Sequence, residues 1–335
     1  MTYEQFVQEI REDKSRDVYL FTGPEDYLKE RSVEALEKAL LTPGMVELDE
    51  MVFESPDENA VMQACEIVPM MSKKRLVIVK DFSAFTSKGG EGQAEKLVKW
   101  LGDFPQTCCL VFYMRESADM RKKLSSAIAR RGSVVEFEFL TQNRLEKWIE
   151  TQSSRRGVSF DRGAPAKLLE LAGLGLTRLS GELDKLCDYA GKGGRVTKDM
   201  IDELVTPTLE ARIFQMIDCL MDGNVAKATG LVNNMLQSGE TRIGILFMLT
   251  RQMRLMTHIK TLRQEGVPQA QIEKRLDIKS YALRRMDEQA RRFPLEKLKG
   301  AYIECVDADF NIKSGRLREQ AALDRIILLL GDVKK

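Results

Sequence analysis

The chain of 335 residues is longer than one compact unit usually is, so its length predicts two or three domains. Lysine and arginine number 52 and aspartate and glutamate 51, so bulk charge indicates neither a nucleic-acid coat nor a membrane-surface protein. Residues 1–17 contain no uninterrupted apolar run, so we expect neither a secretory signal nor a membrane anchor, and we expect a cytoplasmic protein.

The first third of the chain alternates short apolar runs with segments of helical spacing. The expected strands are residues 18–21, 47–53, 75–79, 108–113 and 134–139. The expected helices between them are residues 26–41, 56–67, 91–102 and 120–131. This order predicts an open α/β domain over residues 1–140, with a parallel sheet like that of nucleotide-binding proteins.

Strand signals stop after Leu140, and the rest of the chain predicts helices separated by short breakers. A small helical domain is expected over residues 141–207, and Thr206-Pro207-Thr208 is the expected linker after it. Residues 208–335 form the last expected domain. Its long amphipathic segments, at residues 209–221, 225–237, 243–264 and 317–330, predict a helical bundle.

Neither the cysteines nor the single histidine predicts a catalytic or metal site. The cysteines lie inside apolar patterns and form no CxxC pair, which favours reduced core residues; they are Cys65, Cys108, Cys109, Cys187, Cys219 and Cys305. The histidine, His258, lies in a long apolar helical segment and is expected to be partly buried or at the surface rather than a general base. We therefore expect no catalytic residue and no cofactor.

The turn after the first expected strand has the place of a phosphate-binding loop but lacks its chemistry. A working loop needs GxxxxGK[ST] between a strand and a helix. Counted from Gly23, Leu28 replaces the second glycine, Lys29 falls on the lysine position, and Glu30 replaces the Ser or Thr that holds magnesium. A carboxylate there would meet phosphate oxygens with like charge, so this degenerate loop is expected not to bind nucleotide.

The end of the third expected strand agrees with this interpretation. An ATPase places an acidic pair there for magnesium and water, and here Lys80 replaces the first acid. An alternative is that Gly23 makes an ordinary tight turn from strand to helix, as in any α/β protein. Both interpretations predict no nucleotide hydrolysis at this loop.

Several segments, in this order and spacing, resemble the delta subunit family of bacterial DNA polymerase III. They are Val18 to Leu28, Leu76 to Asp81, Ile213 to Asp218, Val225 to Leu236, Ile245 to Arg254 and Asp309 to Gly315. The resemblance implies an AAA+-like domain without ATPase activity, a small helical lid domain and a C-terminal helical collar domain. It also implies that the chain opens the beta sliding clamp for loading onto primed DNA, together with delta prime and the gamma or tau ATPase subunits.

The resemblance places the hydrophobic wedge that contacts the clamp just before the third strand. Here the chain has Val68, Pro69, Met70 and Met71, at an expected helix end and followed by basic residues. Methionine side chains are flexible and polarizable, and full burial of one contributes roughly 1.5 to 3 kcal/mol. The alternative is that these apolar residues seal the helix end against the sheet.

A basic window extends from residue 241 to 300, with 14 basic and six acidic residues. Within it Arg285, Arg292 and Lys299 recur every seven residues, although Pro294 is expected to interrupt a single helix through them. These side chains could approach DNA phosphates, meet acidic surfaces of neighbouring subunits, or form an ordinary solvated helix face. No aromatic residues are interleaved for base stacking, so sequence-specific DNA recognition is not expected.

Two other classes of protein remain as alternatives. One is an active AAA+ ATPase of the clamp-loader type, against which Leu28, Glu30 and Lys80 argue. The other is a helical nucleic-acid-binding module unrelated to the clamp, which depends on the basic window. ATP binding would identify the first, and salt-dependent DNA binding without affinity for the clamp would identify the second.

Overall fold

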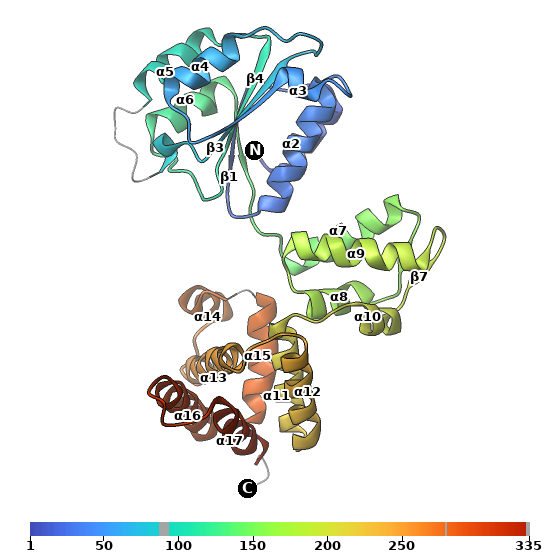
Figure 1. Ribbon diagram of the computed structural model, residues 1–335, viewed down its shortest axis with the longest axis vertical. Coiled ribbons are helices and arrows are strands. Elements are labelled where there is room, and N and C mark those ends of the chain that lie inside the picture. The colour runs from blue at the N-terminus through green and yellow to red at the C-terminus, as the bar shows by residue number, and fades with distance from the viewer. Residues whose placement is uncertain (87–93, 279, 333–335) are drawn as a thin grey trace. The chain divides into compact units, whose positions relative to one another are not determined.

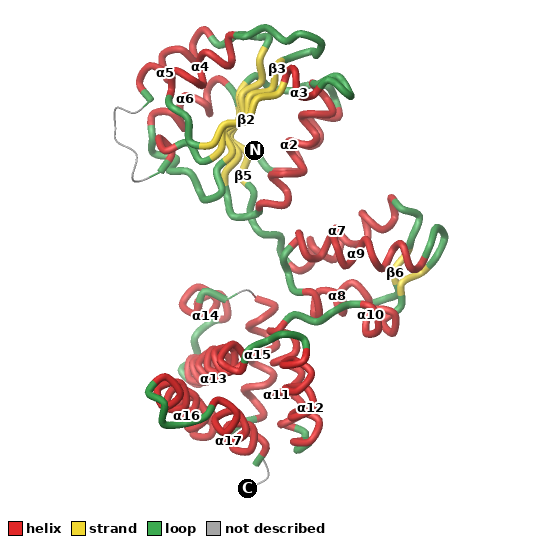
Figure 2. Tube along the Cα trace, viewed as in Figure 1, coloured by secondary structure: helices red, strands yellow, loops and turns green. Residues whose placement is uncertain are grey.

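The computed structural model describes residues 1–86, 94–278 and 280–332 (Figures 1 and 2). The chain forms two compact units, Met1–Thr141 and Gln142–Lys335. The first unit contains a parallel sheet with helices and the second is almost entirely helical, as the sequence predicts. The expected boundary near residue 207 lies inside the second unit, so its division into a lid and a collar domain stays a prediction.

The sheet of the first unit has five parallel strands in the order β2-β3-β4-β1-β5. They are β1 (Val18–Thr22), β2 (Glu50–Glu54), β3 (Arg75–Lys80), β4 (Cys108–Tyr113) and β5 (Ser133–Glu136). All five expected strands are present. The second strand was expected to begin at Glu47 and begins at Glu50, because Val46–Asp49 form the helical turn α3.

Helices cover both faces of the sheet (Figure 1). Helices α1 (Tyr3–Arg11) and α2 (Asp26–Leu40) lie on one face, and α4 (Glu58–Glu66), α5 (Glu95–Trp100) and α6 (Lys123–Arg131) lie on the other. Alternate residues of β1 divide accordingly: Val18 and Leu20 join the core under α4 to α6, while Tyr19 and Phe21 pack edge-on against Phe6 of α1. Burial on both faces explains why the strands are continuous apolar runs.

Helices of the first unit begin or end at other residues than the sequence predicts, and local contacts explain the difference. Asp57 caps α4 by accepting the Ala60 N–H at 2.8 Å, so this helix begins at Glu58. The helix expected over residues 91–102 begins among residues that lie outside the described part, and its described portion is α5 followed by the 3₁₀ turn Leu101–Asp103. A second 3₁₀ turn, Ser83–Phe85, follows β3.

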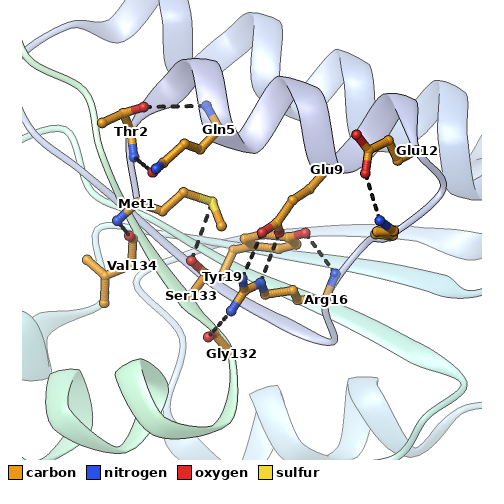
Figure 3. Close-up of polar contacts among 11 residues, drawn as sticks. Met1, Thr2, Gln5, Glu9, Glu12, Arg16, Tyr19, Gly132, Ser133 and Val134 are labelled. Carbon is orange, nitrogen blue, oxygen red and sulfur yellow. Dashed lines mark hydrogen bonds and ion pairs between the residues drawn. The ribbon is translucent and has the colours of Figure 1, made fainter.

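Helix α1 was not predicted, although the apolar residues between Tyr3 and Ile10 recur at helical spacing and Phe6 among them is fully buried. Its start is fixed by a capping box in which Thr2 and Gln5 exchange side-chain to backbone hydrogen bonds (Figure 3). Its end is tied to the sheet by Arg16, which pairs with Glu9 at 2.8 Å and donates to the Gly132 carbonyl oxygen. Local capping and ionic contacts therefore add to the burial of Phe6 in holding this helix.

The second unit begins with a small helical group that carries a short strand pair. The helices are α7 (Gln142–Arg155), α8 (Ala164–Ala172), α9 (Leu176–Ala190) and α10 (Lys198–Leu204). The expectation that strands end at Leu140 was wrong, because Ser159–Phe160 (β6) and Arg195–Val196 (β7) pair in parallel. Two-residue strands are too short to show alternating hydrophobicity in the sequence.

The remaining helices share one large apolar core. They are α11 (Leu209–Met221), α12 (Val225–Gln237), α13 (Arg242–Gln264), α14 (Gln269–Leu276), α15 (Ser280–Arg292), α16 (Leu295–Lys313) and α17 (Glu319–Gly331). The four long amphipathic helices that were predicted here are present, and Pro294 separates α15 from α16 as expected. None of the helices in the described ranges is long and apolar enough to cross a membrane.

The cysteines are free thiols, as expected from their apolar surroundings. All are buried except Cys219, which is partly exposed. Burial raises the pKa of Cys109, and both burial and the neighbouring Cys108 raise the pKa of Cys65. The Cys65 and Cys109 thiols are therefore neutral core groups rather than reactive thiolates.

Candidate functional site

The turn between β1 and α2 is packed closely against the segment that follows β5. Gly23 has a φ of +113°, and a Cβ atom there would lie 2.4 Å from the carbonyl oxygen of Phe137. The same oxygen accepts the Glu25 N–H at 3.1 Å, while the Phe137 N–H donates to the Thr22 carbonyl oxygen at 2.8 Å. Glycine is required here, because any side chain would collide with Phe137.

Lys29, at the lysine position of the degenerate phosphate loop, is completely buried. Its ammonium group donates to the carbonyl oxygens of Gly23 at 2.7 Å and Met114 at 2.6 Å, with a longer contact to Arg115 at 3.2 Å. It also pairs with the Asp26 carboxylate at 2.8 Å. An ammonium group has three protons, so these contacts leave none directed at a phosphate.

The other altered positions of this loop have different surroundings. Leu28 is buried in the core of the first unit, whereas Glu30 lies exposed on α2. At the end of β3, Lys80 lies 3.9 Å from Glu54. The next residue, Asp81, accepts the Arg115 N–H at 2.9 Å and pairs with the Arg115 guanidinium at 3.1 Å. The acidic group next to Lys80 is thus engaged within the protein.

The apolar residues expected at a helix end lie instead in a loop of residues 67–74, between α4 and β3. Helix α4 ends at Glu66, so the 67–74 loop is not a helix tip. Met70 is 71% exposed, Met71 58% and Val68 65%, and Pro69 is partly exposed. These side chains therefore do not seal the helix against the sheet. Exposed apolar clusters of this kind mark interaction sites.

A buried carboxylate holds the 67–74 loop in place. Asp49, the last residue of α3, is fully buried, and its two oxygens accept the backbone N–H groups of Met70 at 2.6 Å, Met71 at 2.9 Å and Ser72 at 2.9 Å. Burial by itself would raise the pKa of Asp49, but these hydrogen bonds outweigh it and lower the pKa below its ordinary value. The carboxylate is therefore charged at neutral pH.

The end of α2 provides a second set of contacts to the same loop. The Thr42 hydroxyl donates to the Met71 carbonyl oxygen at 2.7 Å, and the Thr42 N–H donates to the Ser72 hydroxyl at 3.0 Å. The Lys73 N–H donates to the Leu40 carbonyl oxygen at 3.0 Å. Sequence reasoning missed both Asp49 and Thr42, because nothing in the sequence relates them to a loop more than 20 residues away.

The basic residues singled out from the window of residues 241–300 lie on α15 and α16 and are paired with acids. Arg285 is largely buried, 3.1 Å from Glu170 of α8 and 3.7 Å from Asp218 of α11. The more exposed side chains pair nearby, Arg292 with Asp222 at 2.6 Å and Lys299 with Glu296 at 2.9 Å. Arg285 and Arg292 line one pocket on α15, and the DNA or subunit contact expected of the three residues stays a prediction.

No histidine or metal centre adds to these features. His258 is exposed on α13, consistent with the surface position that was one of the two expected. Across the described ranges, no three His, Cys, Asp or Glu side chains are grouped so that they could hold a metal ion.

Two family models match the chain. The model described as "DNA polymerase III, delta subunit" matches residues 19–138, and that of its C-terminal domain matches residues 210–330. The parallel sheet followed by a mainly helical half, together with these two matches, therefore defines a subunit of DNA polymerase III. More specifically, the chain belongs to the DNA polymerase III delta subunit family.

Individual relatives agree with this assignment. DNA polymerase III subunit delta of Bacillus subtilis is 25% identical over 329 residues, which cover 96% of this chain and 94% of the relative. A probable delta subunit of Aquifex aeolicus is 25% identical over 202 residues, covering 58% of this chain and 57% of the relative. The solved structure of the Bacillus subtilis DNA clamp loader delta protein has the same fold, with a TM-score of 0.73 at 22% identity, covering 98% of this chain and 99% of that structure.

Proposed function

We propose that this protein binds the beta sliding clamp through the 67–74 loop and holds the ring open for loading onto primed DNA. The observation that carries the proposal is the exposure of Met70 and Met71, at 71% and 58%, on a loop that hydrogen bonds fix in position. Apolar side chains presented in this way gain free energy only when a partner buries them.

The proposed mechanism uses binding free energy rather than chemistry. Burying Met70 and Met71 contributes roughly 1.5 to 3 kcal/mol for each side chain. If the open clamp offers these side chains a better pocket than the closed clamp, the difference in affinity stabilises the open ring. ATP binding in the partner subunits would control when the loop is accessible.

The direct test is capture of purified beta clamp by the wild-type chain and by the Met70→Ala/Met71→Ala variant. We expect the double variant to lose most of the captured clamp, because the removed atoms are the apolar anchors. Met120→Ala, an exposed methionine of the same unit, is the matched control and should bind normally. Undiminished capture by the double variant would remove the 67–74 loop from the mechanism.

We further propose that the chain neither binds nor hydrolyses nucleotide. The contacts of Lys29 with two carbonyl oxygens and Asp26 support this, because they occupy the donors that a phosphate would need. Calorimetric titration with ATP and magnesium should give no heat of binding, with an ATPase subunit as positive control. Turnover of ATP by the purified chain would contradict the proposal.

Assembly with the gamma or tau subunits and delta prime is assigned to the helical half. Exposed apolar residues there lie on two adjacent helices: Ile243 and Phe247 on α13, and Ile303, Val306 and Phe310 on α16. Their spacing places each group on one helix face, and Phe247 and Phe310 are 67% and 61% exposed. We therefore expect this face to pack against helices of a neighbouring subunit.

Reconstitution with purified partner subunits tests this assignment. Phe247→Ser/Phe310→Ser should reduce the yield of complex in size-exclusion chromatography, whereas Tyr189→Ser, an equally exposed aromatic on α9, should not.

Primed DNA is expected to bind through the assembled complex. The isolated chain should therefore show no strong salt-dependent DNA binding. Strong binding of this kind by the isolated chain would favour the nucleic-acid-binding alternative.

A further inference from the structure

We propose that Asp49 is a positioning residue for clamp capture: its buried carboxylate gives the 67–74 loop the shape that presents Met70 and Met71. This inference rests on the proposed function of that loop. Asp49 makes no contact with the clamp in this account, because its side chain is fully buried.

The geometry is that of a charged acceptor surrounded by consecutive backbone donors. One oxygen of Asp49 takes the N–H of Met70, and the other takes those of Met71 and Ser72, at 2.6 to 2.9 Å. Hydrogen bonds to an ionised acceptor are roughly twice as strong as those between neutral groups. The backbone of both proposed anchor residues is therefore fixed by one side chain.

The side chains that do hold the loop, Lys73 and Lys74 through their ion pairs with Asp13 and Asp17, lie at its end and not at the proposed anchors. Val68, Met70 and Met71 are all more than half exposed, so they contribute little packing in the free protein. Thr42 tethers only Met71 and Ser72. Without Asp49 the backbone of Met70 would have to be ordered during binding, and the entropic cost of ordering subtracts directly from affinity.

The test variant is Asp49→Asn in the full chain. Asparagine keeps the size of the side chain but replaces one acceptor oxygen by an amide donor that faces backbone N–H groups. We expect roughly tenfold weaker binding to purified beta clamp, or more, in surface plasmon resonance. We also expect faster amide hydrogen exchange at residues 70–72 in the free variant.

A matched control separates positioning from general loss of stability. Thr22 accepts the buried Ala118 N–H at 2.8 Å, at the carboxyl end of β1. Thr22→Val also removes an acceptor from a buried N–H group in the same unit, but it should leave clamp affinity and exchange at residues 70–72 unchanged. If Asp49→Asn does not fold, Thr42→Val removes one hydrogen bond of the same loop and should show both effects more weakly.

A double-mutant comparison gives a readout that a purely structural role would not change. Once Met70→Ala/Met71→Ala has removed the anchors, adding Asp49→Asn should cost little further affinity, because no anchors remain to be positioned. Full additivity, or normal clamp affinity of Asp49→Asn despite faster exchange, would overturn the inference while leaving the proposed function intact. Normal clamp binding by the double methionine variant alone would instead overturn the proposed function.

Discussion

Lys29 stands at the lysine position of the phosphate-loop motif but makes structural contacts inside the protein. In a working phosphate loop the lysine reaches towards the phosphates. Here its ammonium group binds the carbonyl oxygens of Gly23 and Met114 and the Asp26 carboxylate, which ties the turn after β1 to the segment after β4. The cation therefore has a structural use that does not involve a nucleotide.

Replacing Lys29 by methionine should destabilise the first unit by roughly 2 to 4 kcal/mol, because buried carbonyl oxygens would lose their donor. Urea unfolding followed by circular dichroism measures this change. Lys38→Met, on the exposed side of the same helix, should change the free energy of unfolding by no more than about 0.5 kcal/mol. Equal stability of wild type and Lys29→Met would mean that the buried contacts contribute nothing.

The neighbouring carboxyl groups of Glu50, at the start of β2, and Glu37, on α2, predict that the stability of the fold depends on pH. Burial, together with the charge of Glu37 and a hydrogen bond that protonated Glu50 makes with it, raises the pKa of Glu50 from 4.5 to about 7. The folded protein thus holds a proton that the unfolded chain releases. Stability should fall as the pH rises from 4.5 to 7 and stay lower above that.

Glu50→Gln removes this titration, so the variant should melt at a higher temperature than wild type at pH 8 and show no such gain at pH 4. Thermal unfolding at both pH values provides the measurement. The exposed Glu47→Gln is the control and should show no pH-dependent difference. A gain of the same size at both pH values would refute the shared-proton explanation.

At the scale of elements, capping residues and prolines explain why many helix boundaries were predictable. Thr208 accepts the Ala211 N–H at 3.1 Å and starts α11 at Leu209, where the sequence predicts it. Pro294 ends the preceding pattern and stands before α16. The turn α3 escaped prediction because four residues are too few to show a period, whereas the apolar spacing of α1 was present in the sequence and was overlooked.

Arg285 of helix α15 forms ion pairs with two other helices of the second unit. Arg285 lies between Glu170 of α8 and Asp218 of α11, and its guanidinium carbon lies 4.5 Å from the centre of the Phe214 ring. We expect Arg285→Met to destabilise this unit by about 1 to 3 kcal/mol, because it leaves two carboxylates near each other without their cation.

Chemical unfolding of the wild type, Arg285→Met and Arg292→Met measures how much free energy of unfolding each variant loses. Arg292 pairs with Asp222 at the surface, where such pairs contribute little, so its loss should cost less than about 1 kcal/mol. Equal, small effects of both variants would show that the Arg285 contacts are no stronger than those of an ordinary surface pair.

The whole molecule has separate apolar cores in its two units. One core lies between the sheet and helices α4 to α6, with Leu20 and Phe112 among its members, and the other joins the helices from α11 to α17, with Met253 at zero exposure. The two cores share no residue. Each unit thus has an apolar core of its own, as domains that unfold separately do.

We therefore expect two transitions when the full chain is heated in a differential scanning calorimeter. Lys29→Met should lower the transition of the first unit, and Met253→Ala, which leaves a cavity costing roughly 2 to 5 kcal/mol, should lower the other. A single transition that both variants shift equally would show that the units unfold together.

The sequence by itself determined the class of the fold, the five strands, the long helices and the departure from the phosphate-loop motif at Leu28 and Glu30. These features depend on local periodicity, caps and motif spacing, which are visible in a linear string. Only the tertiary structure decided that Lys29 is buried, that Arg285 is an internal ion pair, and that Asp49 holds the 67–74 loop. Those facts depend on contacts between residues distant in the chain, and no local pattern specifies which distant groups folding will bring together.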